Sequence, residues 1–411
     1  MRFIIYNMNN EKNIVRKKQW VKFRHRIWRN IAYCVLYPYA RIRYGLHCEK
    51  FREQGNRQYL ILYNHQTPFD QFFVGMSFKG VLYYVSTEDI LSNGWISKLL
   101  RYLVAPIPFV KQTSDIAAVK TCVTVIREGG SIAMAPEGNR TYSGETVYIK
   151  PAVAKLIKFL KVPVALYRIE GGYGVEPRWS DVIRKGHVHA YVSRVLEVEE
   201  VQSLSDEALY ELICKELYVN EARVDGQQYT HKNAAQFLER VIYVCPDCGL
   251  SRFESFRDTL TCLKCKKETR YLPTKELYGS KFRFVKDWYD WQKSFINKLQ
   301  LDAYIATALY EDVVTLIEVI LYERKNIIWK KCTLSLFGNR LELWHGDEKL
   351  QLAYDDCSTI TVLGRNKLNI YYDKKTYQVK GDKRFNALKY MNIFYHYKNE
   401  TEKNSDEFLG I

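Results

Sequence analysis

The segment Asn64–Asp70, with the sequence NHQTPFD, places a histidine and an aspartate five residues apart, directly after the apolar run 59–63. Pro68 excludes a continuous helix here, so we expect a loop that enters a helix and can bring the two side chains together. An aspartate that accepts a hydrogen bond from one imidazole nitrogen leaves the other nitrogen free as a general base. Taken alone, this spacing is a weak signal, and it more often reflects a loop histidine whose hydrogen bonds are satisfied by a neighbour.

A second segment with chemical potential is Ala135–Gly144, which has the sequence APEGNRTYSG and follows the strand-like run SIAMA. The Pro-Glu-Gly sequence marks a tight turn at the carboxyl edge of a sheet, where α/β proteins bind ligands. Arg140 in this turn can hold a phosphate through two parallel hydrogen bonds. The residues of this segment predict the turn but leave open whether a ligand binds to it.

Together the two segments resemble a known family. NHQTPFD matches the His-x4-Asp motif of the glycerolipid acyltransferases, the group that contains the 1-acylglycerol-3-phosphate acyltransferases. APEGNR matches their Phe-Pro-Glu-Gly-Thr-Arg block and places Glu137 72 residues after His65. Two weaker blocks occur in the expected order: PIPFVK at 106–111 resembles the block that ends in a phosphate-contacting arginine, and KVPVALY at 161–167 resembles the Val-Pro-Ile-Val-Pro block. The resemblance covers residues 1–200.

Four positions depart from the family pattern. Lys111 stands where the family has arginine, Asn139 replaces a threonine, Ala135 a phenylalanine, and Leu166 the second proline of the last block. A lysine offers a point charge in place of the guanidinium fork. These changes leave the reaction unaffected, but they leave the identity of the acceptor open.

The resemblance implies an O-acyltransferase of phospholipid synthesis in which His65 and Asp70 are catalytic. His65, oriented by Asp70, would take the proton from a hydroxyl of a phosphorylated glycerol acceptor, expected to be 1-acylglycerol 3-phosphate. That oxygen would attack the thioester of acyl-CoA or acyl-carrier protein. The residues expected to bind substrate are Lys111, Glu137, Gly138 and Arg140. The two cations would hold the phosphate, while the Glu-Gly pair would shape the pocket without touching the reacting atoms.

Four of the ten cysteines form two Cys-x-x-Cys pairs with thirteen residues between them: Cys245, Cys248, Cys262 and Cys265. Four thiolates in this spacing match tetrahedral Zn²⁺, and Gly249 allows the tight turn that follows the first pair. Because four protein ligands leave no position for a catalytic water, we predict a structural zinc ribbon. A pair of disulfides is the alternative, and a reducing cytoplasm argues against it.

Short apolar runs alternate with helical patterns over residues 59–200. The strand-like runs are 59–63, 81–85, 131–135 and 162–167, and the helical patterns are 69–79, 88–103, 113–128 and 150–160. This alternation predicts an α/β domain with a mostly parallel sheet. Two acidic helical stretches, 204–218 and 232–241, are expected to follow it.

The chain beyond Asp312 consists of short strand-like runs and a final helix. The predicted elements are strands at 313–322, 328–337, 340–344, 349–353, 358–363, 367–372 and 375–379 and a helix at 382–397. They predict a small antiparallel β domain, a barrel or sandwich with a C-terminal helix. The order of elements resembles a pleckstrin-homology or GRAM-type module, which would bind lipid or protein.

The first fifty residues carry most of the net positive charge of the chain, +10 of +16. Lys and Arg number 62 against 46 Asp and Glu, a net charge of +16, and residues 1–50 hold twelve of these cations and only two acids. Between Ile14 and Pro38 the large apolar residues fall three or four positions apart, as on one face of a helix that ends at Pro38. They are Trp20, Phe23, Ile27, Trp28, Ile31 and Val35. Aromatic residues beside a basic face suit an anionic membrane surface, although packing on the helix's own domain would give the same pattern.

These observations predict four parts: an N-terminal basic helix (1–45), an acyltransferase domain with trailing helices (46–240), a zinc ribbon (241–275) and a small β domain (276–411). No run reaches the roughly 18 apolar residues of a spanning helix, and the first residues lack a signal peptide's apolar core and cleavage site. We therefore expect a cytoplasmic protein, peripheral on the inner face of the cell membrane. The alternative is a lipid-binding or nucleic-acid-binding scaffold without transferase activity. The sequence argues against nucleic acid, because no basic stripe with interleaved aromatic residues lies near the ribbon.

Overall fold

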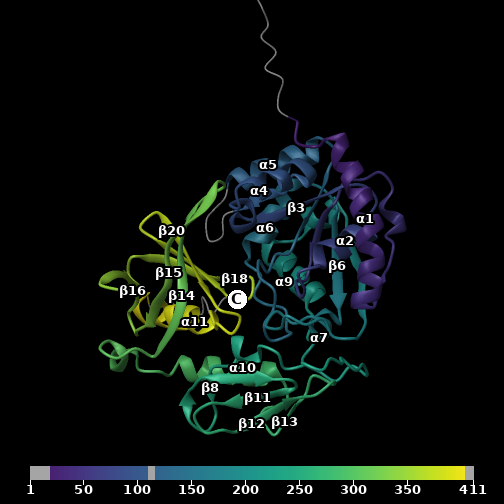
Figure 1. Cartoon of the computed structure of the whole chain (residues 1–411). Helices are drawn as coiled ribbons and strands as arrows, with labels where there is room; N and C mark the ends of the chain where they lie inside the picture. Colours follow the sequence, from purple (N-terminus) through teal and green to yellow (C-terminus); the bar gives the residue numbers. More distant parts are fainter. Residues whose placement is uncertain (1–18, 110–115, 403–411) are drawn as a thin grey trace, which may run out of the picture.

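The computed structural model describes residues 19–109 and 116–402 and shows three lobes (Figure 1). The first lobe, purple to teal, contains the α/β sheet, and the lobe below it in Figure 1 contains the cysteine cluster. The third lobe, green to yellow, contains an antiparallel sheet. Lys111 lies outside the described residues, so its expected role stays a prediction.

The first lobe is built around a seven-stranded sheet. In spatial order its strands are β1 (Leu46–Cys48), β7 (Val188–Leu196), β6 (Val164–Glu170), β2 (Leu60–Tyr63), β5 (Ser131–Met134), β3 (Leu82–Thr87) and β4 (Ile107–Phe109). All neighbouring pairs are parallel except β6 and β7. The predicted α/β fold with a mostly parallel sheet is confirmed. The three-residue strands β1 and β4 are too short to produce a periodic signal in the sequence.

Helices cover both faces of this sheet. The helices are α1 (Phe23–Tyr44) and α2 (Asp70–Ser77) on one face, and α5 (Ile116–Arg127), α6 (Ala152–Leu160) and α9 (Asp206–Leu217) on the other. Side chains of strand β2 pack in the apolar layers on both faces of the sheet, because successive side chains of a strand point to opposite faces. Ile61 and Tyr63 pack in the first cluster, whereas Leu60 and Leu62 pack in the second. The strand is therefore held from both sides, and the loop that follows it starts from a fixed point.

Helix α1 extends beyond the proline at which the sequence predicts its end. Pro38 lies inside the helix, and the chain leaves it at Gly45, which has φ 57° and donates its N–H to the carbonyl of Ala40. A proline inside a helix costs about 3 kcal/mol. The last turns nevertheless stay helical because Ala40 and Tyr44 are buried against the first lobe. A side chain at position 45 would also collide with the carbonyl oxygen of Gly186, 2.2 Å from an ideal Cβ.

The second lobe is a small antiparallel ribbon followed by a helix. Its elements are β8 (Val244–Cys245), β9 (Gly249–Leu250), β10 (Phe253–Phe256), β11 (Thr259–Cys262), β12 (Glu268–Tyr271), β13 (Leu277–Tyr278) and α10 (Val285–Ile296). The helix expected at 232–241 is wrong, because this segment forms turns and a short 3-10 helix, Leu238–Arg240. Phe237 has φ 66°, and Arg240 is held by the carbonyl groups of Trp179 and Lys383. Tertiary contacts therefore override the local helical pattern.

The third lobe is an antiparallel half-barrel with a closing helix, as predicted. Its spatial order is β17-β16-β15-β14-β20-β19-β18. The strands are β14 (Tyr310–Ile320), β15 (Arg324–Leu336), β16 (Arg340–His345), β17 (Glu348–Ala353), β18 (Cys357–Leu363), β19 (Lys367–Tyr372) and β20 (Lys375–Gly381), and the helix is α11 (Leu388–Glu402). Helix α11 packs on β18.

The second and third lobes share one apolar core. Buried residues of the ribbon, of α10, of the half-barrel and of α11 form a single cluster. The same cluster includes Tyr142, Tyr173 and Trp179 of the first lobe. The part boundaries after residues 45, 240 and 275 stay predictions, and the shared core indicates that the last two parts depend on each other.

Candidate active site

The structure brings His65 and Asp70 together at the carboxyl end of β2. The imidazole Nδ1 of His65 lies 2.7 Å from Oδ2 of Asp70, the first residue of α2. Asp70 is fully buried, and its carboxylate also accepts hydrogen bonds from the backbone N–H groups of Gln66 and Thr67 and from the Thr67 hydroxyl. An acceptor with this many donors stays in one orientation, and it fixes His65 in the tautomer that carries its proton on Nδ1.

Asn64 anchors the same loop from its other end. Its side-chain amide donates to the carbonyl of Ile169 and accepts from the backbone N–H of Ile169, at 2.8 and 2.7 Å. The loop is thereby tied to β6, which lies beside β2 in the sheet. Asn64 belongs to the motif recognised in the sequence, but its positioning role shows only in the fold.

Burial sets the protonation state of His65. Desolvation lowers its pKa below the usual 6.5, while the hydrogen bond and the charge of Asp70 raise it. Since burial is the larger effect, the imidazole is neutral at pH 7 and can accept a proton at Nε2. His65 lines the cavity described below, so a substrate can approach this nitrogen.

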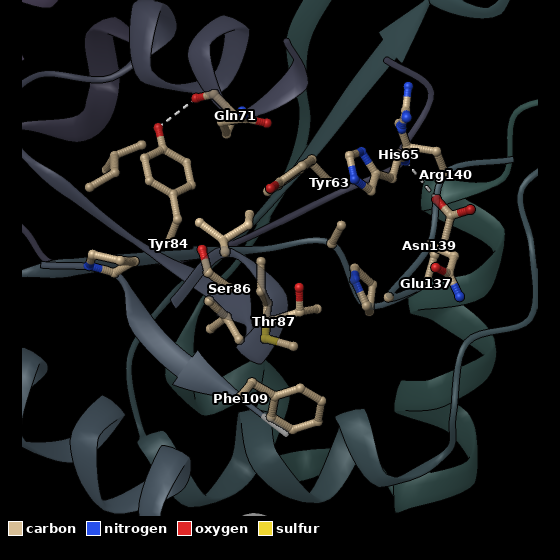
Figure 2. Close-up of a pocket in the computed structure, with 18 of the residues that line it drawn as sticks. Tyr63, His65, Gln71, Tyr84, Ser86, Thr87, Phe109, Glu137, Asn139 and Arg140 are labelled. Atoms are coloured by element: carbon tan, nitrogen blue, oxygen red, sulfur yellow. Dashed lines mark hydrogen bonds between the residues drawn. The ribbon is translucent and has the colours of Figure 1, made fainter. Parts of the chain in front are cut away.

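Glu137 connects the two motifs. Its Oε1 accepts from the backbone N–H of His65 at 2.7 Å (Figure 2), and its Oε2 accepts from the N–H of Val147 at 2.8 Å. The pKa of Glu137 is raised to about 8, because burial raises it by more than the hydrogen bonds from the two N–H groups lower it. The backbone of Thr141 also donates to the carbonyl of His65. Both carboxylate oxygens of Glu137 face backbone groups, and its role in shaping the pocket stays a prediction.

A cavity of about 1140 Å³ opens beside these residues. It exceeds the roughly 300–1,000 Å³ of most ligand pockets. Figure 2 shows His65, Glu137 and Arg140 on one side of it and Tyr84 and Gln71 on another. Much of the remaining wall is apolar and includes Leu36, Phe72, Val85, Leu100, Val119 and Met134. The cavity therefore combines a polar end with a long apolar space.

Arg140 is one of the cations at the polar end. Burial, together with the neighbouring Arg178 and Arg365, lowers its pKa to about 10. Its Nη1 is buried without a hydrogen-bond partner among the described residues. Gly138, three residues after Ala135 in the turn, has φ 67° and is exposed, with its N–H bonded to the Ala135 carbonyl. An unpartnered guanidinium nitrogen at a cavity wall favours an anionic ligand there.

One family model matches the part of the chain that contains this site. The family model "Acyltransferase" matches residues 46–167. That segment is an acyltransferase family domain. It runs from β1 into β6 and contains both motifs of the site.

Among solved structures, the crystal structure of the 1-acyl-sn-glycerophosphate (LPA) acyltransferase PlsC from Thermotoga maritima is similar to this chain. The identity is 16%, the TM-score is 0.38, and the match covers 47% of this chain and 75% of that one. No curated protein sequence matches the chain.

The four predicted metal ligands lie together in the ribbon. Sγ of Cys245 is 3.7 Å from Sγ of Cys265, and Sγ of Cys248 is 3.6 Å from Sγ of Cys262. All four sulfur atoms lie within 4.8 Å of one another. Sulfur atoms around a tetrahedral Zn²⁺ with bonds of about 2.3 Å are about 3.8 Å apart, so the cluster fits this ion. A disulfide needs an S–S distance of about 2.05 Å, so these sulfur positions exclude the alternative of two disulfides.

The surroundings of the cluster also suit a dianionic metal–thiolate centre. Gly249 has φ 74° in the expected tight turn, and the Lys264 ammonium lies beside the cluster and donates to the Cys248 carbonyl. A second group of possible ligands consists of His47 on β1, Glu49 just after that strand and His189 on β7; the first two are exposed, His189 is half-buried, and Glu49 already pairs with His189.

Three residues of the site carry no recognisable sequence signal. Arg178 is buried and donates to the carbonyl of Arg140 at 2.8 Å. Thr361 and Leu363, of the C-terminal half-barrel, line the same cavity as His65. No motif surrounds any of them, so only the folded chain reveals them.

Proposed function

We propose that this protein transfers a fatty acyl group from a thioester donor to a hydroxyl of a phosphorylated glycerol acceptor, as a step of phospholipid synthesis. The observation that carries the proposal is the buried His65–Asp70 pair, with a 2.7 Å contact, on the wall of a cavity that also contains Arg140. The family match over residues 46–167 supports the same reaction class.

In the proposed reaction, Nε2 of His65 takes the proton of the acceptor hydroxyl as its oxygen attacks the thioester carbonyl. The carbon–sulfur bond then breaks, and the imidazolium returns the proton to the leaving thiolate. Asp70 stabilises the imidazolium between the two transfers. No covalent acyl-enzyme is needed, and the proton balance closes within one catalytic cycle.

General-base catalysis accounts for roughly 10²–10⁴ of the acceleration. The remainder comes from holding the hydroxyl and the thioester in contact, which can supply about 7–11 kcal/mol when the geometry is right. The apolar part of the cavity suits an acyl chain, and Arg140 suits the acceptor's phosphate. The expected acceptor is 1-acylglycerol 3-phosphate, and the donor is acyl-CoA or acyl-carrier protein.

The test is a transfer assay with the full-length protein. Purified protein is incubated with a panel of acyl-CoA and acyl-carrier-protein donors and with glycerol-based acceptors, with and without a phosphate, and the products are identified by mass spectrometry. His65→Ala should abolish transfer, whereas His47→Ala, a change on the same sheet outside the cavity, should not. Wild-type turnover by His65→Ala, or no product with any pair of substrates, would reject the proposal and favour a lipid-binding scaffold.

We further propose that an anionic membrane surface presents the acceptor. Helices α1 and α4 (Trp95–Val104) are in contact, and together they expose a set of large apolar side chains, here called the apolar face. Its members are Phe23, Ile27, Ile31 and Val35 of α1 and Trp95, Ile96, Leu99 and Tyr102 of α4. Arg24 lies among them and stacks on Tyr102. Apolar side chains beside cations suit the boundary between headgroups and acyl chains.

The structure refines the prediction for the N-terminal helix. Phe23 is 76% and Val35 63% exposed, whereas the opposite side of α1 packs on the first lobe through residues such as Ala40 and Tyr44. The helix therefore packs on its own domain and still presents its apolar stripe outward. Trp20 is the exception, because it packs into the core and its indole N–H donates to the Ala105 carbonyl.

The proposal places the protein in the cytoplasm, peripheral on the inner face of the membrane. Within the described ranges, no helix has both the length and the hydropathy to cross a bilayer. Zn²⁺ in the four-cysteine site would have a structural role, because all four positions of a tetrahedral ion are taken by thiolates.

A further inference from the structure

The wall of the active-site cavity extends into the C-terminal half-barrel. Thr361, Leu363 and Gly364, at the end of β18 and in the turn after it, line the same cavity as His65. Met391 and Tyr395 of α11 line it as well. In Figure 1, β18 lies on the side of the half-barrel that faces the first lobe. Residues about 300 positions after the His65–Asp70 loop therefore form part of the wall around the space in which the proposed reaction occurs.

A buried arginine joins this wall to the acyltransferase motif. Arg178 is 2% exposed, and its guanidinium donates to the carbonyl of Arg140 at 2.8 Å. The same guanidinium donates to the carbonyls of Val362 and Gly364, at 3.0 and 3.1 Å. One side chain thus fixes the distance between the turn that carries Arg140 and the end of β18.

A second arginine, from the half-barrel itself, reaches back to the first lobe. Arg365 donates to the buried carboxylate of Glu176 and lies 3.4 Å from Asp181. Glu176 also accepts a hydrogen bond from Tyr44 of α1. The turn between β18 and β19 is therefore held by charge pairs on its far side as well.

The half-barrel is fastened on another side of the cavity too. Asp89, of α3 (Glu88–Leu91), lies 2.6 Å from the ammonium of Lys325, 2.9 Å from that of Lys367 and 2.8 Å from the amide nitrogen of Gln378. The neighbouring Ile90 lines the cavity. Contacts on two sides hold the half-barrel over the opening as a fixed wall.

Two polar groups on the opposing walls lack partners. Nη1 of Arg140 and Oγ1 of Thr361 are both buried without a hydrogen bond in the described part of the chain, and both residues line the cavity. Thr361 is only 4% exposed. Arg140, Arg178 and Arg365 place three cations here, and of these it is Arg365 that pairs with both Glu176 and Asp181, on the far side of the turn. The cavity side therefore has hydrogen-bond donors and excess positive charge for an anion.

We propose that the C-terminal half-barrel is part of the active site, and that the phosphate end of the acceptor binds between Arg140 and the Thr361–Gly364 segment. This inference rests on the proposed acyl transfer and deepens it. Arg178 and Arg365 are positioning residues, because their hydrogen bonds tie the half-barrel to the first lobe beside Arg140. Thr361 donates its hydroxyl to the phosphate. The module that resembles a pleckstrin-homology domain thereby serves as a specificity wall for the acceptor.

The test measures acceptor binding separately from turnover. Short-chain 1-acylglycerol 3-phosphate is titrated calorimetrically into full-length protein carrying His65→Ala, alone and combined with Thr361→Val or Arg365→Gln. Loss of one charge-assisted hydrogen bond should raise Kd about tenfold or more. Arg365→Lys should recover part of the affinity. Arg384→Gln, which removes an ion pair to Glu239 away from the cavity, is the matched control and should leave Kd unchanged.

Kinetics of the single variants supply the second readout. Thr361→Val and Arg365→Gln should raise the acceptor KM while the donor KM and kcat stay near wild type, and a phosphate-free acceptor should be affected much less. Unchanged acceptor Kd and KM in both variants would overturn the inference, as would parallel losses for donor and acceptor. If wild-type protein transfers acyl groups but these variants behave like Arg384→Gln, only this inference fails. If wild type transfers to no acceptor, the proposed function fails first.

Discussion

Replacing Asp70 by asparagine tests the proposed mechanism most directly, and the structure indicates how the amide would lie. Oδ2 of Asp70 faces three N–H donors, from His65, Gln66 and Thr67. Oδ1 faces the Thr67 hydroxyl, which can rotate and accept as well as donate, and it makes one longer contact of 3.1 Å with the N–H of Thr67. The carbonyl oxygen of an asparagine should therefore take the Oδ2 position, so the tautomer of His65 is kept and only the negative charge is lost.

The expected loss can be calculated from that charge. When His65 carries the transferred proton, its charge and that of Asp70 are centred about 4 Å apart, which at an effective dielectric constant of about 20 corresponds to about 4 kcal/mol. Since 1.36 kcal/mol is a factor of ten, Asp70→Asn should lower kcat about 10³-fold. The acceptor KM should change little, because Asp70 lies behind the imidazole and does not line the cavity.

The assay is the rate of transfer as a function of pH. Asp70 raises the pKa of His65 against the effect of burial, so Asp70→Asn should also move the acid limb of the profile to lower pH. Asp258→Asn, which removes an exposed ion pair with Arg270, is the control and should behave like wild type. A loss of less than tenfold in kcat, or a change in KM alone, would refute a role of Asp70 in stabilising the imidazolium.

Further measurements address the other parts of the molecule. The kcat/KM of wild type should be flat near neutral pH and fall only below pH 6.5, because burial lowers the pKa of His65 and the base must be neutral; a midpoint above 6.5 would contradict this. Arg140→Ala should weaken binding of a phosphorylated acceptor by about 1.5–3 kcal/mol, seen as a higher KM for that substrate only. Elemental analysis should find one Zn²⁺ per chain, lost in Cys245→Ser, with partial activity remaining. The double variant Phe23→Ser, Ile31→Ser should lose part of the binding to anionic vesicles that persists at high salt. If the double variant binds the vesicles as well as the wild type does, α1 has a purely structural role.

Much of the geometry of the candidate site could be predicted from the sequence because it is local. The loop between His65 and Asp70 is short, and its proline and its following helix bring the two side chains together. The cysteine spacing likewise determines a four-ligand site without knowledge of the rest of the fold. Such features depend on a few consecutive residues, and the structure reproduces them.

Other features could not be predicted because they depend on packing between distant segments. Pro38 predicts a helix end, but the burial of Tyr44 outweighs the cost of the proline. Arg178 is one arginine among many until the fold places it between the carbonyls of Arg140 and Gly364. Helix α10 differs, because its sequence does contain a pattern that predicts a helix. Its buried residues recur at helical spacing, and Asp287 accepts a hydrogen bond from the backbone N–H of Phe284 at its start.

The ribbon connects the metal site to the active site through the shared core. The Tyr310 hydroxyl, at the start of the half-barrel, donates to the carbonyl of Tyr243 and accepts from the N–H of Ser251, on either side of the first cysteine pair. Gln292 of α10 binds the backbone on both sides of Tyr243. A metal bound by the four cysteines would fix the base on which the half-barrel stands, and the half-barrel is the proposed wall for the acceptor. Loss of zinc should therefore act on acceptor binding before it acts on the His65–Asp70 pair, whose own loop is anchored in the first sheet.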